Sequence, residues 1–206
     1  MTSRGLTGRR QFVQGLAAAG LAGLVPCAHA QESRGGSAVL SGNDIALTLS
    51  EMAVNITGRP RVATVVNASL PGPLLRLRQG EDVTIRVTNR LKETSSIHWH
   101  GFILPNPMDG VPGLTYAGIA PGETFVYRFP IVQAGTYWYH SHSGMQEQTG
   151  LSGPIIIAPS GPDPVGYDRE YVILLADWTD EDPMTIVANL KQQSDYYNYY
   201  QRTLGT

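Results

Sequence analysis

The chain has 206 residues, of which 42% are hydrophobic and 16% charged, a composition that is ordinary for a globular protein and argues against disorder. This length predicts one domain with additions rather than two complete domains. With a formal net charge of −2 at pH 7, the chain has no electrostatic reason to bind nucleic acid or an anionic membrane.

Residues 1–30 differ from the rest of the chain and resemble an export signal. They contain arginines but no acidic residue, then an apolar run at 16–25, then Ala-His-Ala at 28–30, which is typical of a cleavage site. The run is too short to span a bilayer as a stable helix. The sequence Thr-Gly-Arg-Arg-Gln-Phe-Val at 7–13 resembles a twin-arginine signal, although an ordinary secretory signal with paired arginines would look the same. We therefore expect a twin-arginine signal peptide at 1–30 and export to the periplasm.

Residues 41–160 alternate apolar and polar side chains with a period of two, which indicates strands with one buried face. Turn signals rich in glycine and proline separate these segments, and no helical stretch lies between them. Short strands at this spacing predict an all-β fold, a Greek-key β-sandwich, at 41–160. The alternating strands are centred on residues 45–49, 83–87 and 125–129, and the strand-forming residues at 137–139 and 155–157 predict two more.

Residues 161–206 have a different pattern, a linker followed by short elements. Tyr-Val-Ile-Leu-Leu-Ala at 171–176 predicts one strand. Asp182 and Pro183 predict the start of a helix, with the aspartate as its cap. The predicted apolar face of this helix holds Ile186, Val187 and Leu190. So short a segment cannot enclose a core, so we expect an incomplete second domain with one strand and a helix, and unpartnered apolar side chains at 172–174.

The histidines are the strongest functional signal in the sequence. Four of the five form two His-x-His pairs, His98 with His100 and His140 with His142. On a strand, positions i and i+2 point to the same face, so two such strands facing each other inside a sandwich would aim four imidazoles at one place. Neutral imidazole binds copper, zinc, iron and nickel, so the pattern predicts a metal site, and ligand chemistry alone permits copper or zinc.

Other interpretations of a His-x-His pair fit this chain less well. A single pair is often coincidental or solvated, but here the two pairs account for every histidine after His29. A cupin requires a glutamate a few residues after its pair, and a metallo-β-lactamase requires an aspartate close behind its pair. Neither residue follows His98 and His100 at that spacing.

The histidine pairs belong to longer sequences that closely resemble the first cupredoxin domain of multicopper oxidases. These are Ser-Ile-His-Trp-His-Gly at 96–101, Met-Asp-Gly-Val-Pro at 108–112 and Gly-Thr-Tyr-Trp-Tyr-His-Ser-His at 135–142. Further sequences are similar to the copper-resistance protein A branch of that family, at 143–150, 176–183 and 193–198. The resemblance covers nearly the whole chain after the predicted signal, and it implies a cupredoxin, or plastocyanin-like, fold with copper as the cofactor.

The resemblance also implies a role for each histidine. His98 would bind the type 2 copper of a trinuclear cluster, and His100, His140 and His142 would bind the type 3 coppers. No catalytic residue is expected beyond these metal ligands. The remaining cluster ligands would come from histidine motifs that this chain lacks. A type 1 copper needs a cysteine thiolate, whereas the only cysteine, Cys27, lies in the predicted signal.

Two hypotheses about function follow. In the first, the chain is the N-terminal part, or a fragment, of a periplasmic multicopper oxidase for copper resistance, an oxidoreductase that couples O2 reduction to oxidation of Cu(I) or phenolic substrates. Its partners would be copper ions, O2 and the missing C-terminal cupredoxin domains, and the chain alone would be inactive because it lacks the type 1 site. In the second, it is a non-catalytic periplasmic copper-binding module. Neither hypothesis involves nucleic acid or a membrane span.

Three residues close to the histidines have structural interpretations that we favour. Trp99 and Trp138 are expected to pack, turned away from the neighbouring imidazoles by the alternation of the strand. Asp109 could supply protons near the cluster, but Asp109 followed by Gly110 is first of all a turn signal.

Overall fold

The computed structural model describes residues 38–163 and 165–198. The predicted signal peptide at 1–30 lies outside the described residues. Within them, no helix is both long and apolar enough to cross a membrane. The elements in chain order are β1 (Val39–Ser41), β2 (Asp44–Val54), β3 (Arg61–Val66), β4 (Leu74–Arg78), β5 (Asp82–Asn89), β6 (His98–His100), the 3-10 helix η2 (Asn106–Met108), β7 (Thr124–Pro130), β8 (Gly135–His140), β9 (Ser152–Ala158) and α2 (Pro183–Gln192).

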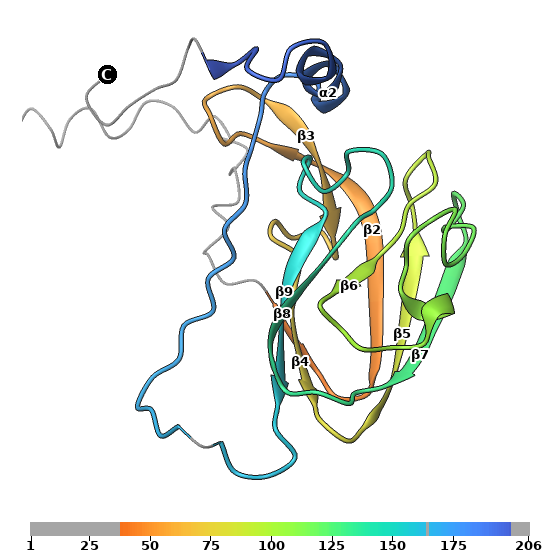
Figure 1. The fold of residues 1–206 in the computed structure, drawn as a ribbon, viewed down its shortest axis with the longest axis vertical. Helices are drawn as coiled ribbons and strands as arrows, with labels where there is room; N and C mark the ends of the chain where they lie inside the picture. Colours follow the sequence, from red (N-terminus) through yellow and green to blue (C-terminus); the bar gives the residue numbers. More distant parts are fainter. Residues whose placement is uncertain (1–37, 164, 199–206) are drawn as a thin grey trace, which may run out of the picture. The chain divides into compact units, whose positions relative to one another are not determined.

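The strands form two sheets that enclose one core as a β-sandwich (Figure 1). One sheet has five strands in the order β1-β4-β9-β8-β6, and the other has four in the order β3-β2-β5-β7. The chain crosses from β5 in the four-stranded sheet to β6 in the five-stranded sheet and returns to β7. The predicted all-β Greek-key sandwich is therefore confirmed.

The alternation in the sequence places every second side chain of a strand between the sheets. In β2, Ile45, Leu47 and Leu49 are buried, and the parallel register with β5 sets Ile45 beside Ile85 and Leu47 beside Val87. Each fully buried aliphatic side chain stabilises the fold by about 1.5–3 kcal/mol. The five predicted strands are confirmed as β2, β5, β7, β8 and β9.

Two aromatic residues hold β6 and β8 against the core. Trp99 and Tyr139 are fully buried and lie opposite each other in the antiparallel β6–β8 register. The Trp99 ring meets the ring of Tyr127 in β7 edge-on, with 5.1 Å between centroids, so it reaches the opposite sheet. Tyr139 Oη donates a hydrogen bond to the Pro73 carbonyl oxygen at 2.9 Å. A Cβ at Gly153 would lie 2.2 Å from Tyr139 Cζ, so only glycine leaves room for this ring.

The tail, defined as residues 165–198, departs from the prediction at one point. The sequence predicts a strand at 171–176, and this prediction is wrong, because these residues run as unpaired chain. A strand needs a neighbour to take its N–H and C=O groups, and no described strand pairs with this segment. Ile173 is 78% and Leu175 89% exposed, so unpartnered apolar surface is indeed present, although Val172 and Leu174 are half-buried.

The predicted helix is confirmed as α2, which begins at Pro183. The Asp182 side chain caps it by accepting hydrogen bonds from the backbone N–H groups of Met184 and Thr185. The three residues of the predicted apolar face line one shared hollow, as expected for Ile186, Val187 and Leu190.

Candidate metal centre

The two histidine pairs lie on neighbouring strands of one sheet. His98 and His100 are the two ends of β6, and the antiparallel register sets His98 opposite His140 of β8. The expectation that the two strands face each other across the sandwich is wrong, since they are hydrogen-bonded neighbours in the five-stranded sheet. Because Trp99 and Tyr139 point into the core, the alternation turns His98, His100 and His140 to the outer face of that sheet.

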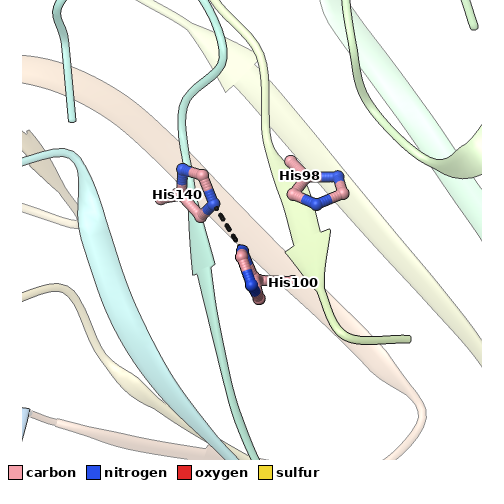
Figure 2. A group of neighbouring side chains, drawn as sticks. All are labelled: His98, His100 and His140. Atoms are coloured by element: carbon pink, nitrogen blue, oxygen red, sulfur yellow. Dashed lines mark hydrogen bonds between the residues drawn. The ribbon is translucent and has the colours of Figure 1, made fainter.

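The four imidazoles nevertheless converge, as the sequence predicts. Figure 2 shows His98, His100 and His140 turned toward one another, and one nitrogen atom from each lies within 4.8 Å of the others. His142 follows just after the end of β8, and its ring centroid lies 4.7 Å from that of His98 and 5.0 Å from that of His140. His140 is only 4% exposed, whereas His100 and His142 are exposed. One side of the cluster is therefore open to further groups.

The backbone fixes the His98 ring and its tautomer. His98 Nδ1 lies 2.8 Å from the Asp109 carbonyl oxygen and 3.5 Å from Asp109 Oδ1. A carbonyl oxygen can only accept, so Nδ1 carries the proton and the Nε2 lone pair is free for a metal. Gly110 allows this approach, because a Cβ there would lie 1.8 Å from the Ile97 carbonyl oxygen. Asp109 thus lies in a tight loop, as predicted, and also beside a candidate ligand.

An acidic side chain orients His140 in the same way. His140 Nδ1 lies 2.8 Å from Glu147 Oε2 and 3.1 Å from the Ser141 carbonyl oxygen, so Nδ1 carries the proton. Nε2 therefore carries a lone pair, which accepts a hydrogen bond from His100 Nδ1 at 3.2 Å (Figure 2). Two imidazole nitrogens bound to one tetrahedral ion at about 2.0 Å would be about 3.3 Å apart. The spacing of this pair therefore fits a metal.

The prediction for the two tryptophans is right for Trp99 and wrong for Trp138. Trp99 faces the core, but the Trp138 ring stacks on His140, with 4.0 Å between centroids and 15° between planes. The Trp138 centroid also lies 5.0 Å from that of His100. The cause is the same alternation, since Trp138 and His140 are two residues apart on β8 and share its outer face. Trp138 therefore covers one side of the imidazole cluster.

The surroundings favour neutral imidazoles. Burial lowers the pKa of His140 below its ordinary value, and the Glu147 carboxylate opposes only part of that shift. The pKa of His142 is also lowered, first by partial burial of its ring and then by charge repulsion from the nearby His98. Because neutral imidazole is the form that binds a metal, both side chains are prepared for a metal near pH 7.

The sequence pattern does not indicate the roles of three further polar residues of the site. Glu147 holds His140, as described above. Ser96 Oγ accepts a hydrogen bond from the His142 backbone N–H at 2.9 Å, and the buried Gln146 accepts one from Ser141, which lies between His140 and His142. Glu147 and Gln146 follow the second histidine pair closely in the sequence, but that proximity alone does not predict a contact.

The fold and the donor set together define a class of protein, the cupredoxin-like β-sandwiches that carry a metal on imidazole ligands. The sequence profile described as multicopper oxidase matches residues 48–162, and the chain belongs to this family. Copper is the cofactor that the family implies, and the four converging imidazoles are suitable donors for it. The copper cofactor inferred from the sequence is thereby confirmed at the level of the family.

The individual relatives agree with this assignment. The chain is 56% identical over 203 residues to Copper resistance protein A of Pseudomonas syringae pv. tomato, covering 97% of this chain and 33% of the relative. It is 52% identical over 204 residues to Copper resistance protein A of Escherichia coli, covering 97% and 34% respectively. The crystal structure of a multi-copper oxidase from Pseudomonas thermotolerans matches with a TM-score of 0.57 and 35% identity, covering 62% of this chain and 32% of that one. The chain spans about a third of the length of these curated relatives.

Proposed function

We propose that this chain supplies half of the ligands of a trinuclear copper cluster in a multicopper oxidase. His98 binds the type 2 copper, and His100, His140 and His142 bind the type 3 coppers. The convergence of four imidazoles on the outer face of β6 and β8 is the observation that carries this proposal. The cluster is open on one side, which leaves room for the further ligands that three copper ions require.

The residues of the chain act by holding and orienting the ligands. Copper bound here supplies one-electron redox chemistry with dioxygen as the acceptor. The Asp109 carbonyl oxygen and the Glu147 carboxylate keep the Nδ1 protons of His98 and His140 in place, so that Nε2 of each ring faces the metal. Trp138 stacks on His140 and shields it from water.

The proposal extends to the whole protein, which is a periplasmic oxidase for copper resistance exported by the twin-arginine pathway. This oxidase oxidises Cu(I) or phenolic compounds and reduces O2. Residues 41–160 form its first cupredoxin domain, and residues 161–206 form a linker and the start of a second domain. The type 1 copper and the other cluster ligands come from C-terminal cupredoxin domains. The 206 residues alone do not oxidise a substrate, because a type 1 copper needs a cysteine thiolate and the only cysteine, Cys27, lies in the proposed signal peptide.

A copper-binding module without catalysis is the second candidate. It is favoured by one observation, that the chain holds four converging imidazoles but lacks the thiolate that a type 1 site requires. In this case the chain retains copper and consumes no O2.

The decisive experiment begins with the DNA that follows the codon for Thr206. An open frame that encodes further cupredoxin sequence with a His-Cys-His motif is expected, and its full product should consume O2 with Cu(I) or a phenol. The His98→Ala variant of that product should lose this O2 uptake. A stop codon with no such sequence nearby, together with copper retention by the chain, would favour the binding module instead.

A further inference from the structure

A buried amide, that of Gln146, connects the two segments that carry the histidine pairs. Gln146 belongs to the loop that follows β8, and it is only 4% exposed. Its Oε1 accepts hydrogen bonds from Ser95 Oγ at 2.7 Å and from Ser141 Oγ at 2.9 Å. Its Nε2 donates to Glu93 Oε1 at 2.9 Å and to the Thr94 carbonyl oxygen at 3.1 Å. An amide offers two acceptor and two donor positions, so all four are used.

These bonds connect the two segments that carry the histidine pairs. Ser95 stands three residues before His98 in the sequence, and Ser141 lies inside the second pair. Ser96 extends the network, because its Oγ accepts the His142 backbone N–H at 2.9 Å and lies 3.4 Å from Ser141 Oγ. Gln146 is therefore at the centre of a buried polar network between the segment before β6 and the loop after β8.

His142 depends on this network because no strand holds it. The β6–β8 pairing ends at His98 and His140, and β8 itself ends at His140. The backbone N–H of His142 accordingly bonds to the Ser96 side chain rather than to a strand neighbour. A shift of the loop relative to the segment before β6 would change the 4.7 Å between the ring centroids of His98 and His142.

We propose that Gln146 is a positioning residue, which holds His142 at the distance from His98 that a bound metal requires. This inference rests on the proposed function, since it takes the four histidines as copper ligands. Gln146 acts only through the serines. A leucine at this position would remove the acceptor to which the hydroxyls of Ser95 and Ser141 donate, so the loop would shift to find a new one. Loss of such a supporting partner typically lowers metal affinity about 10–100-fold.

Asn89 provides a control that is one residue further from the loop after β8. It is fully buried, its Nδ2 donates to the carbonyl oxygens of Glu93 and Ile119, and its Oδ1 accepts from the Leu91 backbone N–H. It reaches Gln146 only through Glu93, whose Oε1 accepts from Gln146 Nε2, and it bonds to neither Ser95 Oγ nor Ser141 Oγ. Asn89→Leu and Gln146→Leu therefore remove the same kind of buried amide, but only the second removes the acceptor of the two serine hydroxyls.

The experiment compares these two variants with the unaltered protein in the full chain. One readout is the affinity for Cu²⁺ alone, with the electron paramagnetic resonance spectrum of the bound ion. The other, in the metal-free chain, is the hydrogen exchange rate of the His142 backbone N–H. We expect Gln146→Leu to lower the Cu²⁺ affinity at least about tenfold, to change the spectrum and to speed the exchange. Asn89→Leu should leave both readouts within about threefold of the unaltered chain.

Similar changes in both variants, or none in Gln146→Leu, would overturn the inference. If Gln146→Leu fails to fold, Ser141→Ala takes its place, since it removes one hydroxyl from the network, and unchanged readouts there would overturn the inference too. An unaltered chain that binds no Cu²⁺ would overturn the proposed function. The exchange rate of the His142 N–H then decides the inference by itself, because it needs no metal.

Discussion

Replacement of Gly110 by alanine should displace the His98 ring, because an added Cβ would overlap the backbone just before that residue. Gly110 has φ +83°, and an added Cβ would lie 1.8 Å from the Ile97 carbonyl oxygen and 3.2 Å from His98 Cα. Real Cβ atoms essentially never approach closer than 3.0 Å, so the loop and β6 must separate by about 1 Å or more. That movement would break the 2.8 Å hydrogen bond between His98 Nδ1 and the Asp109 carbonyl oxygen.

Gly113 separates this effect from backbone strain. It has φ +81°, and a Cβ there would meet nothing within 4 Å. Both alanine variants therefore carry the cost of a left-handed residue, about 1–2 kcal/mol. Only Gly110→Ala adds the overlap, about 1–3 kcal/mol, and the lost hydrogen bond, about 1 kcal/mol. We expect Gly113→Ala to lower the free energy of unfolding by about 1–2 kcal/mol and Gly110→Ala by about 3–6 kcal/mol.

Urea unfolding of the metal-free variants measures these free energies, and titration with Cu²⁺ measures the site. Gly110→Ala should lose copper affinity about tenfold or more, whereas Gly113→Ala should keep it. The reasoning would be refuted by equal losses of unfolding free energy in the two variants. It would also be refuted by a Gly110→Ala chain that is destabilised but binds copper as well as the unaltered chain.

Three further predictions follow from the structure. Tyr139→Phe should lower the free energy of unfolding by about 1–3 kcal/mol in a denaturant titration, because the buried Pro73 carbonyl oxygen loses its donor; no change would count against that bond. The metal-free chain should lose stability as the pH falls below about 6.5, because His140 and His142 have lowered pKa values in the folded chain and the unfolded chain then binds more protons. Denaturation midpoints at pH 8 and pH 5 test this, and the double His→Gln variant should show a smaller drop. A chain without the tail should remain monomeric at higher concentration in size-exclusion chromatography, because Ile173 is exposed there; identical elution profiles would contradict this.

The sandwich could be predicted because its signal is local. Ile45, Leu47 and Leu49 alternate with less buried residues whatever strand lies beside them, and β5 and β7 show the same period. The strands β8 and β9 are indicated instead by their strand-forming residues. The cap at Asp182 is local in the same sense, since it bonds to the first turn of its own helix. Such features depend on residues a few positions apart, which a sequence displays directly.

Features that depend on pairing between distant segments could not be predicted. Nothing in residues 98–100 says that β8 is their neighbour in the same sheet rather than a strand on the opposite one. The segment at 171–176 has strand-forming residues but no partner to bond with. The contact of Trp138 with His140 could have been predicted from the sequence, because residues i and i+2 of a strand share a face. The contact of Glu147 with His140 could not, because it depends on the path of the loop after β8.

The central claim is that the two histidine pairs form one copper site, and copper retention tests it most directly. The full chain is loaded with Cu²⁺, dialysed and analysed for metal, beside the double variant His98→Ala/His140→Ala. Because the imidazoles of His98 and His140 face each other across β6 and β8, we expect the unaltered chain to retain copper and the double variant to lose it. Equal copper in both chains, or none in the unaltered chain, would contradict the account.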